Sequence, residues 1–362
     1  MADRLRHYTI QITVEGPLFI GSGRSIAKKE YLFDPRKRQV SIPDMGKLCQ
    51  FLREKRLTEA FESYMLNGKE DLSAWFCARN IFPQECRPWI AYTMDSGDAV
   101  FENRGKKEIA TFMKDAYGCP YVPGSSLKGA LRTVLLAADI LRQPQKFQRS
   151  RQAILSAPVS GKRWELQREI GELEQRAFYT LNRDERNRRN AVNDTLSGFR
   201  IGDSEPVSVE DLVLCQKIDV LPDGQQRRLP ILRECLKPGT ELYFPLTIDT
   251  GLCPVTPEQL LHGTTKFIEN YEQEFLRAFP MDEIRGGGNL YLGGGIGFAS
   301  KTVMYPLLGG EGVRRTSEIL SGQFRNHKHA QDPRRGVSPH TVKCTMYRGE
   351  LYEMGACTIE IR

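Results

Sequence analysis

A glycine-rich segment late in the chain constrains the fold more than any other feature. Seven of the twelve positions from Gly286 to Gly297 are glycine, Arg285 stands directly before them and Lys301 follows shortly after. Glycine adopts positive φ angles and lets backbone approach backbone or ligand closely, at a cost in conformational entropy. A concave run of bare N–H groups between two cations suits a phosphate-bearing partner. The alternative at this point is a flexible hairpin tip.

Two known motifs come close to this segment and do not match it. Residues 295–302 have the length of a nucleotide P-loop, but Ser300 replaces its second glycine. A P-loop leads into a helix, whereas the pattern of residues 301–306, which ends at a proline, predicts a strand. The same residues half-match the RNP1 signature but lack its leading basic residue and flanking aromatics. The sequence therefore supports neither ATP hydrolysis nor base stacking on RNP1 aromatics.

Composition limits the class of protein. A chain of 362 residues is long enough for two domains, and 40% apolar with 27% charged residues is typical of a soluble globular protein. The longest apolar run, residues 134–141, is broken by Asp139 and is too short to span a membrane. The N-terminus lacks the apolar core of a signal peptide. Nine scattered cysteines without a CxxC pair predict reduced thiols in the cytoplasm and no structural zinc.

Positive charge is concentrated in two segments. Residues 142–189 hold twelve Lys and Arg against six Asp and Glu, and residues 314–348 hold eight against two, in a chain whose net charge is +7. Two basic segments on an otherwise mildly acidic body indicate an elongated anionic partner. For part of the first segment, an exposed charged helix is the alternative.

Strands and helices alternate along the chain without a run of βαβ units, which predicts an α+β fold. Residues 21–24 are predicted to form a short glycine loop and residues 68–110 an irregular insertion. The predicted strands are residues 7–20, 31–33, 39–42, 199–204, 211–220, 228–236, 241–249, 344–348 and 354–361. The predicted helices are residues 45–57, 57–66, 164–181 and 256–279, together with one whose apolar stripe runs from Leu127 to Leu141.

The start of that last helix is a candidate anion site. Ser125 or Ser126 can cap its first turn, and the free N–H groups there, at the positive end of the helix dipole, attract a phosphate. Lys128 and Arg132 follow one and two turns along, on a neighbouring face. We therefore predict a phosphate contact by these four residues. Capping alone is the alternative explanation for the two serines.

Four segments resemble motifs of the RAMP superfamily of CRISPR effector proteins. They are Gly16–Gly23, Pro123–Arg132, Gly202–Ser204 and Gly293–Phe298, and they follow in the family's order across most of the chain. The resemblance implies ferredoxin-like (RRM-like) folds with the late glycine-rich loop as their hallmark.

On that resemblance we predict two ferredoxin-like domains with helical insertions. The first would span residues 1–198, with insertions near residues 48–110 and 142–195. The second would span residues 199–362 and carry the glycine-rich loop at residues 286–297. No role carries over to the two insertions.

The later part of the chain is similar to one member of that family in particular. Residues 290–302, 327–329, 338–339 and 351–355 resemble the subunit that caps the guide-3′ end of the type III-A (Csm) effector complex. The resemblance implies a non-catalytic subunit that binds guide RNA and an adjacent backbone subunit and supports guide RNA maturation in antiviral defence. A host nuclease that trims the guide 3′ end is a further partner that it allows.

Fourteen residues are predicted to contact RNA, in the helix start, the glycine-rich loop and two basic loops. They are Arg24, Ser125, Ser126, Lys128, Arg132, Arg285, Gly293, Gly294, Gly295, Gly297, Lys301, His327, Lys328 and His329.

An enzymatic function is the alternative. Relatives in the superfamily include ribonucleases that use a histidine, and residues 327–329 form the one local histidine cluster among five histidines. A basic surface loop that touches phosphate explains this cluster better, because no second acid or base is evident. We therefore predict no catalytic residue. A metal-independent guide-processing endoribonuclease, or a scaffold that recruits a trimming nuclease through its insertions, stays as an alternative.

No metal or cofactor is predicted. His327, His329, His340 and Cys344 are residue types that bind zinc, but their spacing matches no standard zinc motif. The carboxylates show no acidic cluster for two-metal hydrolysis. Asp34 and Asp203 fit structural roles at turns.

Overall fold

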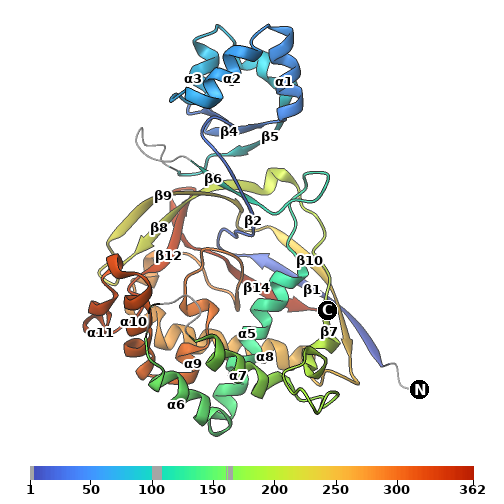
Figure 1. The fold of residues 1–362 in the computed structure, drawn as a ribbon, viewed down its shortest axis with the longest axis vertical. Helices are drawn as coiled ribbons and strands as arrows, with labels where there is room; N and C mark the ends of the chain where they lie inside the picture. The colour runs from blue at the N-terminus through green and yellow to red at the C-terminus, as the bar shows by residue number, and fades with distance from the viewer. Residues whose placement is uncertain (1–3, 100–107, 160, 162–165) are drawn as a thin grey trace.

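The structure is a computed structural model that describes residues 4–99, 108–159, 161 and 166–362. Both predicted insertions, and the start of the helix predicted at residues 164–181, extend into segments outside these ranges. A group of short helices projects from one end of the molecule, two β-sheets form its middle, and longer helices cover the other end (Figure 1).

A five-stranded antiparallel sheet is built around the first strand, β1 (Leu5–Val14). The apolar residues of β1 alternate, and Ile10, Ile12 and Val14 are fully buried on one face, as a half-buried strand requires. The strand order is β11 (Leu290–Tyr291), β14 (Ala356–Ile361), β1, β10 (Glu241–Asp249) and β7 (Phe199–Ile201).

The second sheet has nine strands and is mixed. Strands β8 and β9 form a long hairpin at its centre, and β5 and β6 run parallel to β8 and β9 respectively. Its strands are β2 (Gly21–Ile26), β3 (Leu32–Asp34), β4 (Gln39–Pro43), β5 (Ile90–Asp95), β6 (Ile109–Phe112), β8 (Leu212–Val220), β9 (Gln226–Leu236), β12 (Val342–Tyr347) and β13 (Glu350–Glu353).

Each sheet takes strands from both halves of the chain. In the first, β1 lies between β10 and β14; in the second, β5 and β6 pair with β8 and β9. The boundary predicted between residues 198 and 199 therefore does not separate one sheet from the other.

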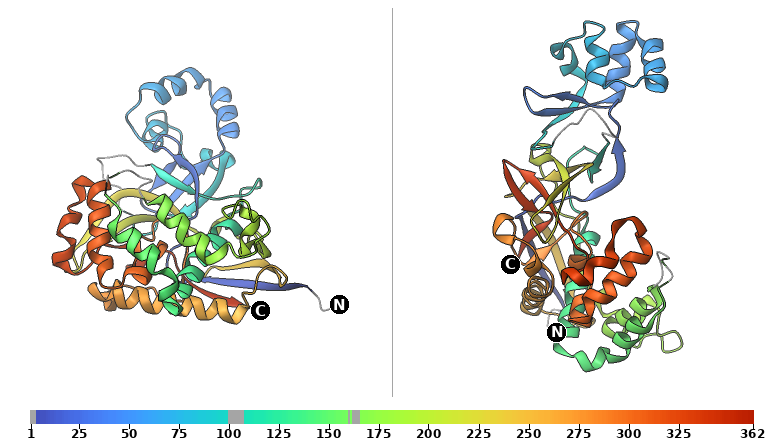
Figure 2. Two further views of the ribbon diagram at one scale, coloured as in Figure 1. Left: turned by 60° about the horizontal axis from the view of Figure 1, so that its bottom comes forward. Right: turned by 90° about the vertical axis from the view of Figure 1, so that its left-hand side faces the viewer.

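Two long helices, α5 (Gly124–Arg142) and α8 (Pro257–Glu274), pack side by side against the first sheet (Figure 2). Thr256 and Gln259 form a reciprocal capping box at the start of α8. The two helices lie close together at Gly263 of α8. A Cβ at this position would be in van der Waals contact with Val134 and Ala138 of α5. No helix in the described ranges is long and apolar enough to cross a bilayer.

The projecting helical group has a core of its own. It consists of α1 (Met45–Glu54), α2 (Thr58–Asn67), α3 (Leu72–Cys77) and α4 (Pro83–Cys86). Trp75, Phe76 and Trp89 are buried together in a hydrophobic cluster separate from the main core. The prediction that residues 68–110 are irregular is wrong, because their aromatic residues close this cluster and β5 and β6 join the second sheet.

The remaining helices surround the α5–α8 pair. They are α6 (Gln148–Ser156), α7 (Gln167–Phe178), α9 (Met304–Leu308), α10 (Glu311–Gln323) and α11 (Asp332–Arg335). The prediction of a strand at residues 301–306 is wrong, because a 3-10 turn ends at Lys301 and α9 begins at Met304. Pro306 lies in the first turn of that helix, where its missing N–H leaves no hydrogen bond unmade.

The prediction of a glycine loop at residues 21–24 is also wrong, because these residues begin β2.

One carboxyl group is buried in the main core beneath the glycine-rich segment. Glu353 of β13 is 1% exposed and accepts hydrogen bonds from the hydroxyls of Tyr271 (2.9 Å) and Tyr291 (2.7 Å). Burial raises the pKa of Glu353 to about 7, and the negative charge of Glu272 adds to this effect.

Candidate nucleic-acid interface

The glycine-rich segment is held against two other parts of the backbone. The N–H of Gly294 donates to the carbonyl of Phe19 (2.6 Å), and the N–H of Leu292 donates to the carbonyl of Gly355 (2.9 Å). Gly293 has φ +88°, and a Cβ there would overlap the Phe19 carbonyl oxygen. The segment is therefore a fixed loop packed on the Gly16–Gly23 motif, and not a flexible hairpin tip.

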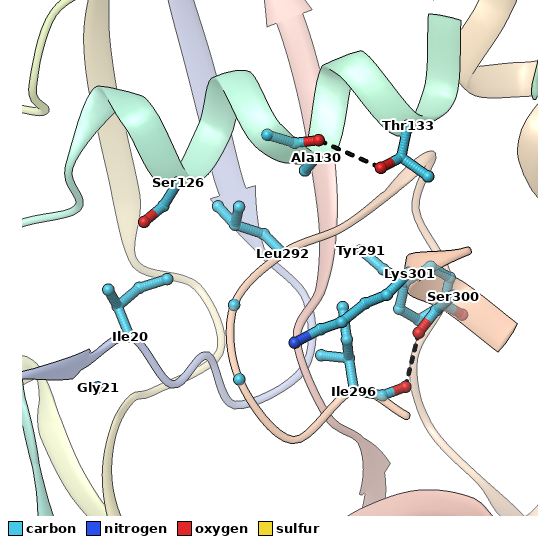
Figure 3. Close-up of a pocket in the computed structure, with 13 residues that line it drawn as sticks. Ile20, Gly21, Ser126, Ala130, Thr133, Tyr291, Leu292, Ile296, Ser300 and Lys301 are labelled. Atoms are coloured by element: carbon cyan, nitrogen blue, oxygen red, sulfur yellow. Dashed lines mark hydrogen bonds between the residues drawn. The ribbon is translucent and has the colours of Figure 1, made fainter. Parts of the chain in front are cut away.

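A cavity of about 370 Å³ lies between this loop and the first turns of α5 (Figure 3). The helix contributes small residues, which leave room for a ligand, and the loop contributes backbone and one cation. The lining residues are Ile20, Gly21, Ser126, Gly129, Ala130, Thr133, Tyr291, Leu292, Gly293, Gly294, Ile296, Ser300 and Lys301.

Two cations border the loop. The ammonium of Lys301 points toward the cavity (Figure 3), and the described part of the chain offers it no hydrogen-bond or ion-pair partner. Loss of water lowers the pKa of Lys301, and the positive charge of Arg233 lowers it further. The Arg233 guanidinium lies over the Phe19 ring (5.3 Å) and 2.7 Å from where a Cβ on Gly295 would stand. A bound anion would relieve the repulsion between the two cations.

Arg233 is a site residue that the sequence analysis missed. It lies on β9 in an alternating strand pattern, where a single arginine looks like an ordinary solvent-facing residue. Only the pairing of β9 with β6 and β8 brings it to the loop.

The start of α5 is capped differently from the prediction. Neither Ser125 nor Ser126 caps the helix; the Asp203 carboxylate accepts a hydrogen bond from the Gly124 N–H (2.8 Å) instead. The Ser204 hydroxyl holds the segment just before the helix by accepting a hydrogen bond from the N–H of Val122 (2.9 Å). The positive end of the helix dipole is therefore already occupied by a carboxylate of the protein.

Replacement of Asp203 by Ala should destabilise the protein by about 1 kcal/mol, because an N–H of the helix start loses its acceptor. Urea unfolding of the variant measures this. Asp203→Asn is the matched control, since its amide oxygen can still accept from Gly124, and it should lose less. Equal losses in the two variants would show that the hydrogen bond is not what Asp203 contributes.

Lys128 and Arg132 contact the protein itself. Lys128 donates to the carbonyl of Leu196 (2.8 Å), and Arg132 pairs with Asp194 (2.8 Å) and Glu174 (3.3 Å). Both face away from the cavity, whose α5 side is formed by Ser126, Gly129, Ala130 and Thr133. Acceptors from distant parts of the chain therefore already hold both cations. Their contact with RNA stays a prediction.

The other predicted RNA-contacting residues are spread around the loop. Arg24 is exposed on β2, three residues beyond Gly21 of the cavity wall. Arg285 pairs with Glu350 of β13 outside the cavity. Gly295 and Gly297 take positive φ angles in the loop itself, and Ser125 is exposed on the first turn of α5.

The residues of the predicted histidine cluster differ in burial. His327 and Lys328 are exposed, whereas His329 is buried and its Nδ1 hydrogen-bonds to Asp332 (2.9 Å). His340, not His327, is the second imidazole on that carboxylate (2.6 Å). None of these residues lines the cavity. The contact of residues 327–329 with RNA stays a prediction.

The model of the RAMP superfamily matches residues 11–298, and the chain therefore belongs to that superfamily. The α+β, ferredoxin-like fold predicted from the four motifs is confirmed. Within this class the chain is similar to proteins named Csm5. The CRISPR system Cms protein Csm5 of Mycobacterium tuberculosis (strain H37Rv) is 29% identical over 394 residues, which cover 100% of this chain and 99% of that protein. Csm5 of Streptococcus thermophilus is 26% identical over 326 residues, 84% of this chain and 82% of that protein.

Two solved structures share the fold. A chain in a cryo-EM structure of a Csm–crRNA–target RNA ternary complex of a type III-A CRISPR-Cas system matches with a TM-score of 0.67 at 18% identity, covering 98% of this chain and 100% of that one. The crystal structure of T. onnurineus Csm5 matches with a TM-score of 0.62, also at 18% identity, over 96% and 99% of the two chains.

Proposed function

We propose that this protein is a non-catalytic RNA-binding subunit of a type III-A CRISPR (Csm) effector complex. It caps the 3′ end of the guide RNA filament, supports guide maturation and docks on an adjacent backbone subunit. The observation that carries the proposal is the cavity between the glycine-rich loop and α5. Lys301, which pairs with no residue in the described ranges, lies at its wall, and Arg233 lies beside the loop. The similarity to Csm5 proteins along nearly the whole chain supports the choice of complex.

The chemistry of this cavity suits an RNA backbone. Its wall offers bare glycine backbone, the hydroxyls of Ser126 and Thr133, and one ammonium. These groups recognise phosphates and 2′-hydroxyls, which are the same in every guide, whereas base edges differ from one spacer to the next. Binding should therefore be nearly independent of spacer sequence and weaken steeply with salt.

The arrangement of acids and bases favours binding over cleavage. Among the described residues that line the cavity, none is a histidine or a carboxylate that could take or give a proton beside a 2′-hydroxyl. His329 and His340 share Asp332 away from the cavity. A guide-processing endoribonuclease is the competing function, and it predicts that the purified protein shortens precursor guide RNA.

Lys301→Gln should weaken guide RNA binding by about tenfold, the loss of one charge-assisted contact to phosphate. The plot of log affinity against log salt should become shallower by about one unit. Fluorescence anisotropy over a series of salt concentrations measures both. Lys266→Gln is the matched control, because Lys266 is an exposed lysine of α8 paired with Glu269; it should leave both quantities unchanged. An unchanged slope in Lys301→Gln would remove Lys301 from the RNA site.

The proposed function is tested by purifying the tagged protein from cells that carry the CRISPR locus, then sequencing the bound RNA and identifying the bound proteins. Mature guides with a discrete set of 3′ lengths, together with other Csm subunits, are the expected result. Unrelated or unprocessed RNA without those subunits would overturn it. Recovery of a nuclease that depends on residues 142–195 would favour the scaffold alternative.

A further inference from the structure

Three side chains between α10 and β12 converge on one point that the RNA-binding proposal does not use. His329 lies in the 3-10 helix η10 (His329–Gln331), Asp332 begins α11, and His340 follows that helix. The Nδ1 atoms of His329 and His340 lie 2.9 Å and 2.6 Å from the two oxygens of Asp332. One potential ligand atom from each residue lies within 4.8 Å of the other two.

This cluster is held in place by further hydrogen bonds. The Ser338 hydroxyl donates to Asp332 (2.8 Å), and the Ser317 hydroxyl of α10 donates to the carbonyl of His329 (2.7 Å). The Tyr305 hydroxyl of α9 donates to the carbonyl of Ser338 (2.6 Å). Hydrogen bonds that fix the orientation of potential ligands in this way are typical of a preorganised metal site.

We propose that His329, Asp332 and His340 bind a divalent transition-metal ion, and that the ion is Zn²⁺. Two imidazoles with one carboxylate are a donor set that zinc accepts and that Mg²⁺ and Ca²⁺, which prefer oxygen ligands, do not select. The Ser338 hydroxyl or a water molecule completes four-coordination.

The positions of the imidazole protons are compatible with binding of the metal ion. Without an ion, Asp332 accepts the Nδ1 protons of both rings, which satisfies the buried carboxylate. When an ion binds, each neutral ring presents its Nδ1 lone pair and carries its proton on Nε2. His329 and His340 are 8% and 7% exposed and Asp332 is fully buried, so an ion held by these side chains would be largely shielded from solvent.

The ligand set differs from the one that the sequence suggests. Cys344 lies on β12 and is not part of the cluster. His327 stacks parallel to His329 with ring centroids 6.1 Å apart and stays exposed, so it covers the site without coordinating. An ion here would tie η10, α11 and the segment before β12 together, which is a structural role.

Metal titration of the purified full-length chain tests the proposal. The chain is stripped with a chelator, dialysed and titrated with ZnSO₄ in a calorimeter, and a second sample is titrated with Co²⁺ and followed by absorption. The wild type and His262→Gln, which changes an exposed histidine of α8, should each bind one equivalent. Asp332→Asn and His340→Gln should bind at least tenfold more weakly. Zinc should raise the melting temperature only of the wild type and the control.

The cobalt spectrum decides the outcome even where a variant does not fold. Four-coordinate nitrogen and oxygen ligands give intense d–d bands without thiolate-to-cobalt charge transfer, and this is the expected spectrum of the wild type. Charge-transfer bands would assign the metal to some of the nine cysteines and overturn the proposal. Absence of stoichiometric binding would also overturn the proposal, as would a folded His340→Gln variant that binds zinc as tightly as the wild type. The cluster would then be a set of structural hydrogen bonds.

Discussion

Gly293→Ala should lower the free energy of unfolding by about 3 kcal/mol and abolish guide RNA binding. A residue with a Cβ pays about 1–2 kcal/mol to take the left-handed conformation of Gly293. The new methyl group would also overlap the Phe19 carbonyl oxygen, which accepts from the next N–H of the loop, and overpacking of this kind costs a further 1–3 kcal/mol, roughly. The loop must move off the Phe19 backbone, and the cavity wall moves with it. Urea unfolding and fluorescence anisotropy measure the two effects.

Gly239→Ala is the matched control for this variant. Gly239 has nearly the same φ, +87°, but a Cβ there meets nothing within 4 Å. It should lose only the conformational contribution, about 1–2 kcal/mol, and should keep its RNA affinity. If the two variants lose equal stability and both still bind RNA, the close approach to Phe19 is not what positions the loop.

Glu353→Gln should remove a pH dependence of stability worth about 3 kcal/mol between pH 5 and pH 8. The pKa of Glu353 is raised from 4.5 to about 7 in the folded protein, mainly because the carboxyl group is buried. Between these two values the folded protein holds a proton that the unfolded chain has released. The stabilisation from that proton is fully present below pH 4.5 and is lost as the pH rises through 7. Relative to Glu353→Gln, the wild type should therefore lose stability as the pH rises from 5 to 8.

The measurement is the free energy of unfolding in urea at several pH values, taken as the difference between variant and wild type so that other titrating groups cancel. Glu360→Gln serves as a control, because Glu360 is an exposed residue of β14 paired with Arg362. Its difference from the wild type should be nearly flat with pH. A flat difference for Glu353→Gln as well would show that Glu353 stays ionised in the folded state.

Short-range patterns in the sequence predicted much of the fold. The strand predicted at residues 7–20 overlaps β1, and the helix predicted at residues 256–279 contains α8, because such patterns depend on neighbours within a few residues. The glycine-rich segment also predicted positive φ angles and close backbone contact, which Gly293 shows. Residues 68–110 were misjudged, because the aromatic residues that close their core come from separate short helices with no common period.

The candidate site was predictable only in part, because its electrostatics depend on distant partners. Lys128 and Arg132 have the spacing of a phosphate site, but Asp194 and Leu196, more than sixty residues away, hold them. Asp203, which accepts a hydrogen bond from the first N–H of α5, likewise lies 79 positions along the chain from Gly124. Arg233 reaches the loop through the pairing of β9 in the sheet, which no local pattern in the sequence indicates.

The pairing of β1 with β14 has a consequence for how the protein is made. β1 is synthesised long before its neighbour β14, since most of this sequence separates the two strands. The glycine-rich loop depends on the same late segment, since Asn289 and Leu292 donate to the carbonyls of Cys357 and Gly355. A nascent or truncated chain that ends before residue 355 therefore has an unpaired edge on β1 and an unanchored loop. The edge of β1 and the glycine-rich loop therefore reach their final arrangement only once the segment around residue 355 is in place.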